Sequence, residues 1–193
     1  MTRPDIGLFM MMSGGVSPTR WILAVATALA EWGPWLAAVV LAWAAWKRPD
    51  QRRYLMALLA VASATSMLSH VIAAAIALPR PFMLGLSPAH IGHGGSAGLP
   101  STHASVMGFV ALALLARPAL RPWALPAAIA ALLTAWARIY AGLHFPLDIL
   151  AGFALSAVAL GVFILLHWLT FGRLVPAFRR LQQGEATTQG RSL

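Results

Sequence analysis

The sequence predicts an all-α protein, a polytopic membrane helix bundle of five or six spans. Of its 193 residues, 60% are hydrophobic and 10% are charged, and the mean hydropathy is +0.75. Soluble domains average about 45–50% apolar and about 25% charged residues, so this composition excludes a soluble globular domain. Long apolar runs are separated by short polar or proline-rich turns. Because about 20 apolar residues cross the hydrocarbon core of a bilayer as a helix, these runs are predicted spans.

The N-terminal part of the chain leaves the number of spans open. The apolar run from Ile6 to Val16 is too short to span, so residues 1–31 are predicted to form an interfacial segment or a partial span. The stretch from Trp21 to Trp46 is apolar but contains Pro34. Proline is tolerated in the first turn of a helix and disrupts its middle. This stretch is therefore either one kinked span or a partial helix followed by a short span.

The remaining spans are bounded by prolines, glycines and arginines. We expect helices over Tyr54–Leu78, from Ser101 or Thr102 to Ala116, over Pro122–Gly142 and over Pro146–Phe171. Residues 82–100 are rich in glycine and are predicted to form a loop. We therefore expect a single transmembrane domain over residues 1–172, with its motifs in 54–170, and a polar tail over 173–193.

The charges predict the orientation in the membrane. Ten of the 14 Lys and Arg residues lie in the turns 47–53 and 117–121 and in the C-terminal tail. Cytoplasmic loops carry an excess of Lys and Arg, so these turns and the C-terminus are predicted to be cytoplasmic. Arg80 and Arg138 then lie on the periplasmic or outer side. The net charge of +9 is thus a topology signal and does not indicate nucleic acid as a partner.

One polar stretch opens a predicted helix. Ser101 and Thr102 precede an apolar run, and the unpaired N–H groups and dipole of a helix N-terminus favour an anion. His103 follows in the first turn. Taken alone, an ordinary helix cap beside a histidine at the headgroup level explains this stretch equally well.

A second polar stretch pairs His144 with Asp148. With Pro146 at the first helical position, Asp148 falls in the first turn and reaches back toward the residues before the helix. A carboxylate on one imidazole nitrogen fixes the tautomer and leaves the other nitrogen free to attack. The alternative is that Asp148 only complements the helix dipole. An idle carboxylate in a membrane zone costs roughly 2.5–3.5 kcal/mol, which disfavours that alternative.

Other polar residues give weaker signals. The guanidinium groups of Arg80 and Arg138 suit a phosphate, although each arginine alone is better explained as an anchor at a helix end. Because both lie on the side that otherwise lacks positive charge, the pair favours a phosphate-binding role. Glu31 and His93 are candidate substrate contacts. The histidines of the glycine-rich loop lack a third ligand at metal-like spacing, so no metal site is predicted. A non-enzymatic transporter is disfavoured, because the middles of the predicted spans are almost wholly apolar.

Three motifs together resemble a known family. Arg80-Pro81, Pro100-Ser101-Thr102-His103 and Arg138-x5-His144-x3-Asp148 resemble the signature of the type 2 phosphatidic acid phosphatase superfamily, over residues 54–170. The run from Arg80 to Gly85 looks like the bacterial undecaprenyl-diphosphatase subgroup linked to bacitracin resistance. The sequence departs from the family at Ala73 (usually lysine), Thr102 (commonly glycine) and Ala137 (usually serine), which bears on substrate range and rate more than on reaction type.

The resemblance implies a mechanism without metal or cofactor. His144 would attack the phosphorus and form a phosphohistidine, Asp148 would orient it, and His103 would protonate the leaving oxygen. The phosphate would be bound by Arg80, Arg138 and the backbone amides near Ser101 and Thr102.

The implied function is an undecaprenyl-diphosphate phosphatase of the bacterial inner (plasma) membrane, acting on a polyprenyl diphosphate at the periplasmic face in cell wall biogenesis. The alternatives are a phosphatase of another lipid (phosphatidylglycerophosphate, phosphatidic acid or lipid A) and a lipid phosphotransferase. The oligomeric state is not predicted.

Overall fold

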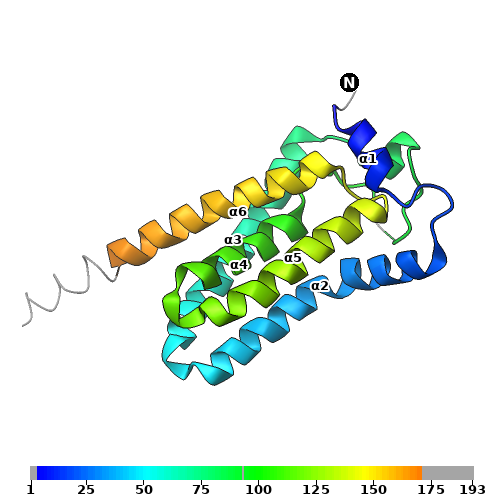
Figure 1. The fold of residues 1–193 in the computed structure, drawn as a ribbon. Helices are drawn as coiled ribbons and strands as arrows, with labels where there is room; N and C mark the ends of the chain where they lie inside the picture. Colours follow the sequence, from blue (N-terminus) through cyan, green and yellow to red (C-terminus); the bar gives the residue numbers. More distant parts are fainter. Residues whose placement is uncertain (1–3, 93, 171–193) are drawn as a thin grey trace, which may run out of the picture. The chain divides into compact units, whose positions relative to one another are not determined.

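The structure is a computed structural model that describes residues 4–92 and 94–170. Within these residues the regular structure is entirely helical, which confirms the predicted fold class (Figure 1). The α-helices are α1 (Ile6–Met12), α2 (Arg20–Lys47), α3 (Arg52–Ile76), α4 (Thr102–Ala116), α5 (Arg121–Tyr140) and α6 (Pro146–His167). Short 3₁₀ turns are η1 (Pro49–Gln51), η2 (Pro81–Leu84) and η3 (Pro118–Leu120).

Four helical segments of the described chain are long and apolar enough to cross a membrane. They are Arg20–Lys47, Pro49–Leu84, Pro118–Tyr140 and Pro146–Thr170, and α4 is an apolar helix of 15 residues beside them. The chain is therefore a multi-pass membrane protein. Whether α4 and the N-terminal segment complete five or six spans stays a prediction.

Helix α2 continues without a break through Pro34, so a single helix replaces the partial helix and short span that the sequence left open. Gly33 is buried against α5, where a Cβ would collide with the side chain of Thr134. The Thr134 hydroxyl donates a hydrogen bond to the carbonyl of Leu29 at 3.3 Å. A neighbouring helix thus supplies a hydrogen-bond donor one residue before Ala30, whose carbonyl would accept the N–H of residue 34 if that residue were not proline.

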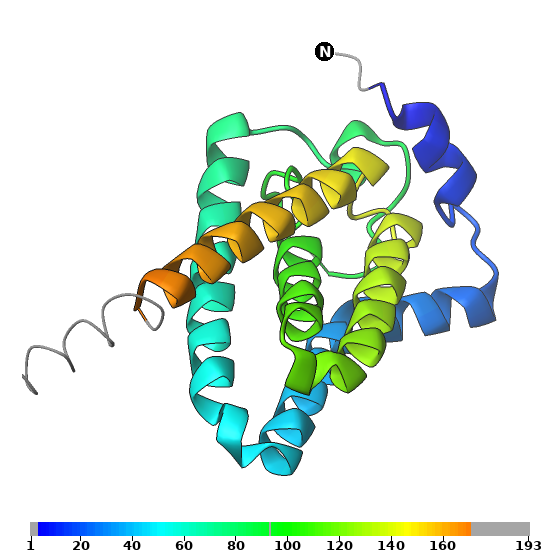
Figure 2. The same cartoon turned by 60° about the vertical axis from the view of Figure 1, so that its left-hand side comes forward.

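The two basic turns lie at one end of the bundle (Figure 2). Arg117 Nε donates to Gln51 Oε1 at 2.8 Å, and the Tyr54 hydroxyl donates to the carbonyl of Ala113 at 2.7 Å. These contacts join η1 and the start of α3 to the end of α4. Both basic turns can lie at the same face of the membrane only if they are at the same end of the bundle, as they are here. The predicted tail over 173–193 lies outside the described residues.

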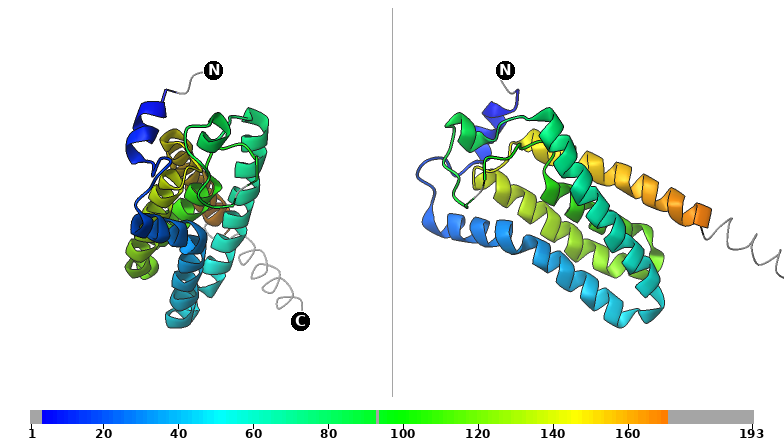
Figure 3. Two further views of the ribbon diagram at one scale, coloured as in Figure 1. Left: turned by 90° about the vertical axis from the view of Figure 1, so that its right-hand side faces the viewer. Right: turned by 180° about the vertical axis from the view of Figure 1, so that it is seen from behind.

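Small residues bring the start of α4 against α6. A Cβ on Gly152 would lie 2.7 Å from the Ala104 side chain and 2.7 Å from the Ser101 carbonyl. The buried Ser156 hydroxyl donates within reach of the carbonyls of Ala104 and Ser105, at 3.2 and 2.9 Å. The first turn of α4 therefore lies beside the second and third turns of α6, toward the end of the bundle away from the basic turns (Figure 3).

A cavity of about 560 Å³ lies between α2, α3 and α4. Its lining is apolar except for Arg52 and includes Pro34, Leu41, Leu59 and Val110. None of the described residues that the sequence predicts to bind phosphate lines this cavity, so the predicted site lies elsewhere.

By their contacts the residues form two compact units, Met1–Ala159 and Leu160–Leu193. The described part of the second unit continues α6, where the rings of Phe163 and His167 lie 6.4 Å apart. All site residues discussed below belong to the first unit.

Candidate active site

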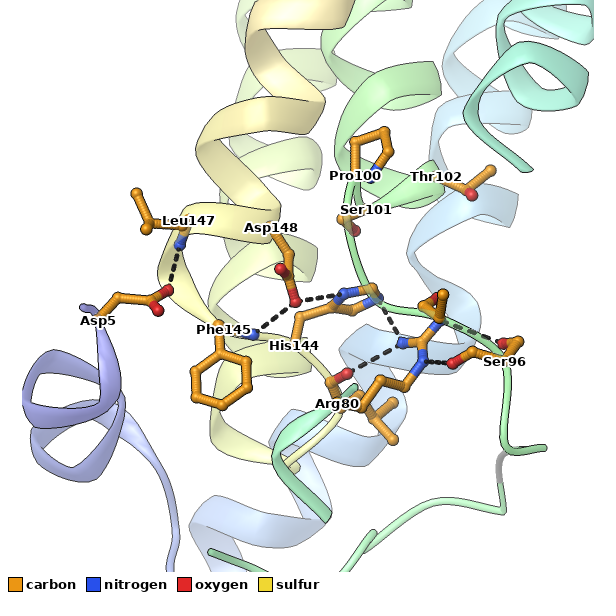
Figure 4. Close-up of polar contacts among 12 residues, drawn as sticks. Asp5, Arg80, Ser96, Pro100, Ser101, Thr102, His144, Phe145, Leu147 and Asp148 are labelled. Atoms are coloured by element: carbon orange, nitrogen blue, oxygen red, sulfur yellow. Dashed lines mark hydrogen bonds and ion pairs between the residues drawn. The ribbon is translucent and has the colours of Figure 1, made fainter. Parts of the chain in front are cut away.

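Three segments converge around one cluster of polar side chains (Figure 4). Arg80 follows α3, Ser101 precedes α4, and His144 lies in the loop between α5 and α6. The Ser101 N–H donates to the carbonyl of Asp148 at 2.9 Å, which joins the starts of α4 and α6 directly. Residues far apart in the sequence are thereby brought to one place.

The Arg80 guanidinium is buried and held by backbone carbonyls. Its Nε donates to the carbonyl of Ser96 at 2.7 Å and its Nη2 to the carbonyl of Ala97 at 3.0 Å. Its Nη1 donates to the carbonyl of Leu143 at 2.9 Å. A planar fork of donors fixed by three acceptors has one orientation, so the direction in which Arg80 presents its charge is set by the backbone.

The His144 imidazole is 2% exposed, and its Nε2 lies 2.9 Å from Arg80 Nη1. A guanidinium can only donate, so Nε2 is the acceptor and the ring proton belongs on Nδ1. Nδ1 lies 3.4 Å from Asp148 Oδ2, a contact longer than an ordinary hydrogen bond. The two neighbours together select one tautomer, with the lone pair on Nε2.

Burial above all, together with the positive charges of Arg138 and Arg80, lowers the pKa of His144 to about 3, and the hydrogen bond and charge of Asp148 oppose this shift only in part. The imidazole is therefore neutral at physiological pH. A neutral imidazole with a defined lone pair is a nucleophile and not an acid.

Asp148 is fully buried and has a second role in the loop. Its Oδ2 accepts the N–H of Phe145 at 2.9 Å, so the carboxylate also closes the first turn of α6. Gly98 packs against it: a Cβ there would lie 2.9 Å from Asp148 Oδ2 and 3.2 Å from Arg80 Cγ. The absence of a side chain at residue 98 therefore lets the carboxylate and the guanidinium lie on the two sides of His144.

The hydroxyls of Ser101 and Thr102 point in different directions. Ser101 is fully buried, and its Oγ has no hydrogen-bond partner among the described residues. Thr102 Oγ1 lies 3.0 Å from Ser69 Oγ on α3, and Figure 4 shows it directed away from Arg80 and His144. Thr102 therefore offers an anion its backbone N–H alone, whereas Ser101, whose N–H already bonds to the carbonyl of Asp148, offers its buried hydroxyl alone.

Arg138 lies in the last turn of α5 and is 5% exposed. Its Nη1 lies 3.4 Å from His103 Nε2, and its Nε has no partner among the described residues. Its carbonyl accepts the N–H groups of Leu143 and His144, at 3.0 and 3.3 Å. Arg138 therefore lies between the two histidines, close enough to His144 to lower its pKa.

The site combines a neutral imidazole, two guanidinium groups, a buried hydroxyl and the N-terminus of an apolar helix. Fixed cations and N–H donors around a nucleophile suit the transfer of a phosphoryl group, whose charge lies on its equatorial oxygens. Among the described residues no group of three or more His, Cys, Asp or Glu side chains could hold a metal ion.

A sequence model of the PAP2 superfamily matches residues 53–172, more than half of the chain. The chain belongs to the PAP2 superfamily. The three motifs that resembled this family all fall inside the matched range, so the resemblance is confirmed.

Two relatives are similar over part of this PAP2 protein. YbjG of Escherichia coli (strain K12), named provisionally as an undecaprenyl-diphosphatase, is 28% identical over 153 residues, which cover 77% of this chain and 75% of YbjG. The undecaprenyl-diphosphatase BcrC of Bacillus subtilis (strain 168) is 32% identical over 80 residues, 42% of this chain and 40% of BcrC.

One solved structure shares the fold. The crystal structure of a transmembrane PAP2-type phosphatidylglycerolphosphate phosphatase from Bacillus subtilis superposes with a TM-score of 0.64 at 21% identity. The match covers 88% of this chain and 87% of that one.

One predicted substrate contact of the PAP2 protein, Glu31, is not joined to this cluster. Glu31 is exposed on α2, and no contact within the described residues links it to Arg80, Arg138 or His144. His93 lies outside the described residues. His90 Nε2 lies 2.9 Å from the carbonyl of Gly15, so this histidine ties the N-terminal segment to the loop.

Sequence reasoning missed the groups that hold the site in place. Ser96, Ala97 and Leu143 act through backbone carbonyls, which leave no signature in side-chain identity. Asp5 and Phe9 contact the loop of His144 from the other end of the chain. Only Gly98 had a signal, as one of the glycines of a predicted loop.

Proposed function

We propose that this PAP2 protein is an undecaprenyl-diphosphate phosphatase, which releases phosphate from the lipid carrier diphosphate at the outer face of the bacterial plasma membrane. The observation that carries phosphoryl transfer is the buried, neutral His144, with Arg80 on Nε2 and Asp148 on Nδ1. The names of YbjG and BcrC support the diphosphate carrier as substrate.

In the first step the terminal phosphoryl oxygens take the Arg80 Nη1 donor that faces Nε2 of His144. The freed lone pair attacks phosphorus, an N–P bond forms, and the bond from phosphorus to the bridging oxygen breaks. His103 gives the leaving oxygen its proton, and the lipid monophosphate departs. The Nε of Arg138 and the hydroxyl of Ser101, both buried, supply further donors to the phosphoryl oxygens.

In the second step His103 takes a proton from water. The hydroxide oxygen bonds to phosphorus, the N–P bond breaks, and phosphate leaves with His144 neutral again. Asp148 stabilises the positive charge that the ring carries while phosphorylated, so it matters most in the intermediate. No step calls for a redox change.

A second candidate substrate is phosphatidylglycerophosphate, which the fold neighbour's name supports. The same residues serve either lipid, since both present a terminal phosphate on an apolar tail. A lipid phosphotransferase differs only in the acceptor of the second step.

A direct assay separates these functions. The full chain is purified in detergent and given polyprenyl diphosphate, phosphatidylglycerophosphate, phosphatidic acid or lipid A in EDTA, and released phosphate is measured. We expect chelator-resistant turnover with the highest kcat/KM for the polyprenyl diphosphate. A higher kcat/KM for phosphatidylglycerophosphate favours the second candidate, and no release from any lipid overturns both.

The nucleophile is tested with a matched pair of histidine variants. His144→Ala is expected to reduce release to background and to abolish an acid-labile phosphoenzyme. His70→Ala is the control, because His70 is exposed on α3 and is not one of the residues of the cluster. Retained phosphoenzyme in His144→Ala contradicts the role of His144.

The chain contains no cysteine, which makes its orientation easy to test. Single-cysteine variants Gly95→Cys, in the loop beside Arg80, and Asp50→Cys, in a basic turn, are labelled on intact cells with an impermeant maleimide. We expect labelling at residue 95 alone. Labelling at residue 50 alone reverses the proposed orientation.

A further inference from the structure

The N-terminal strap, residues 5–15, lies outside the range matched by the PAP2 family and crosses the loop that carries His144. The Gly14 N–H donates to the carbonyl of Tyr140 at 2.9 Å, just before this loop. The Leu147 N–H donates to Asp5 Oδ2 at 2.9 Å, just after it. The strap is therefore bonded on both sides of His144.

Side-chain packing holds the strap against the same loop. Phe9 is fully buried, and its ring centroid lies 5.2 Å from that of Phe145. The cluster around these two rings consists of Ala104, Ala135, Ile139 and Ile149. Because Phe145 directly follows His144 and its N–H bonds to Asp148, Phe9 fixes the residue that links the imidazole to its carboxylate.

The start of α6 explains what Asp5 contributes. Phe145 occupies the N-cap position of α6 and has no side-chain acceptor for the N–H of Leu147, the group that a capping side chain usually takes. Asp5 supplies that acceptor from the other end of the chain, as Figure 4 shows. Asp5 is itself buried, with 7% of its surface exposed. The two carboxylates divide the first turn of α6: Asp5 takes Leu147, and Asp148 takes Phe145 and faces His144.

We propose that Asp5 and Phe9 are positioning residues for His144, an inference that rests on the proposed function. Asp5 caps α6 in place of Phe145, which leaves the Asp148 carboxylate directed at His144 Nδ1. Without Asp5, the N–H of Leu147 competes for Asp148, the other acceptor in this first turn, and the imidazole loses its orientation. The strap thus stabilises the loop that carries His144, because Phe145, the N-cap residue of α6, has no side-chain acceptor with which to cap the helix.

The first test compares Asp5→Ala with Asp5→Asn, because the Asn amide oxygen accepts the same hydrogen bond. A displacement of the order of 1 Å at a reacting group costs about 10²-fold in rate, so we expect Asp5→Ala to lower kcat about 10- to 100-fold with KM within about threefold. Asp5→Asn should retain kcat within about threefold. Asp50→Ala, an acidic residue of the basic turn, is the control and should match the wild type.

The second test asks whether Asp5 acts through Asp148. In an Asp148→Asn background, measured by single-turnover phosphoenzyme formation, Asp5→Ala should cost less than about twofold, because residues that act as a unit are not additive. An equal loss in both backgrounds shows a merely structural role and overturns the proposal. If Asp5→Ala cannot be purified folded, Phe9→Leu is carried through the same two backgrounds with the same expectation.

The two proposals fail in different ways. A wild-type protein that releases no phosphate from any lipid overturns the proposed function. A wild-type protein that is active, with Asp5→Ala as fast as Asp5→Asn, overturns the positioning role alone.

Discussion

Gly98→Ala probes the geometry around His144 with a single methyl group. The added Cβ would lie 2.9 Å from Asp148 Oδ2 and 3.2 Å from Arg80 Cγ, whereas ordinary contact begins at 3.4 Å. The carboxylate must therefore retreat by about half an ångström, and the arginine by less. Since a misplacement of 1 Å costs about 10²-fold, half of that predicts a loss of about tenfold in kcat.

The matched control is Gly95→Ala in the same loop, where a Cβ meets nothing within 4 Å. Neither glycine has a positive φ, so alanine strains neither backbone. Phosphate release by both variants is measured with the lipid that the wild type turns over fastest. A Gly98→Ala rate within twofold of the Gly95→Ala rate refutes the claim that the contacts on both sides of His144 set its reactivity.

Three further predictions follow from the same structure. His103→Gln should lower kcat by about 10²- to 10⁴-fold with KM little changed, as for a lost general acid, and an unchanged kcat removes that role. Because the pKa of His144 is low in the folded chain, the unfolded chain binds a proton on this residue that the folded chain excludes. As the pH falls from about 6.5 to about 3, this difference lowers the free energy of unfolding by about 1.4 kcal/mol per pH unit. Thermal unfolding in detergent should therefore depend less on pH in His144→Ala, and equal dependence contradicts the buried neutral ring. Gly33→Ala should lower the free energy of unfolding by about 1–3 kcal/mol, because the added methyl group collides with Thr134. Gly161→Ala is the control and should not lower it, because a Cβ there meets open space. Equal melting temperatures for the two variants contradict the close packing of α2 on α5.

Much of the fold follows from the sequence because burial in lipid leaves few choices to an apolar chain. A backbone without water must satisfy its own hydrogen bonds, so long apolar runs form helices, and the prolines and glycines between them mark the ends. At Pro34, by contrast, the sequence alone did not decide whether the helix continues. Whether a helix continues past a proline depends on the neighbouring helix, and here Thr134 of α5 lies against Gly33 and bonds to Leu29.

The candidate site could be named from sequence where the chemistry belongs to side chains at fixed spacing. Arg138, His144 and Asp148 lie within one short stretch, and Asp148 reaches back to the start of its own helix as the spacing predicts. The direction of Thr102 could not be predicted, because its hydroxyl bonds to Ser69 on another helix. The roles of Glu31 and His93 as substrate contacts stay predictions.

The sequence by itself determined that this chain is a helical membrane protein with its arginines and histidines gathered in three motifs, since hydropathy and local spacing are properties of neighbouring residues. The tertiary structure alone decided which atoms face each other. Arg80 meets Nε2 of His144 because distant backbone carbonyls orient the guanidinium. Asp5 caps a helix more than a hundred residues away because Phe145 cannot. Contacts between remote parts of a chain are set by packing, and no local pattern records them.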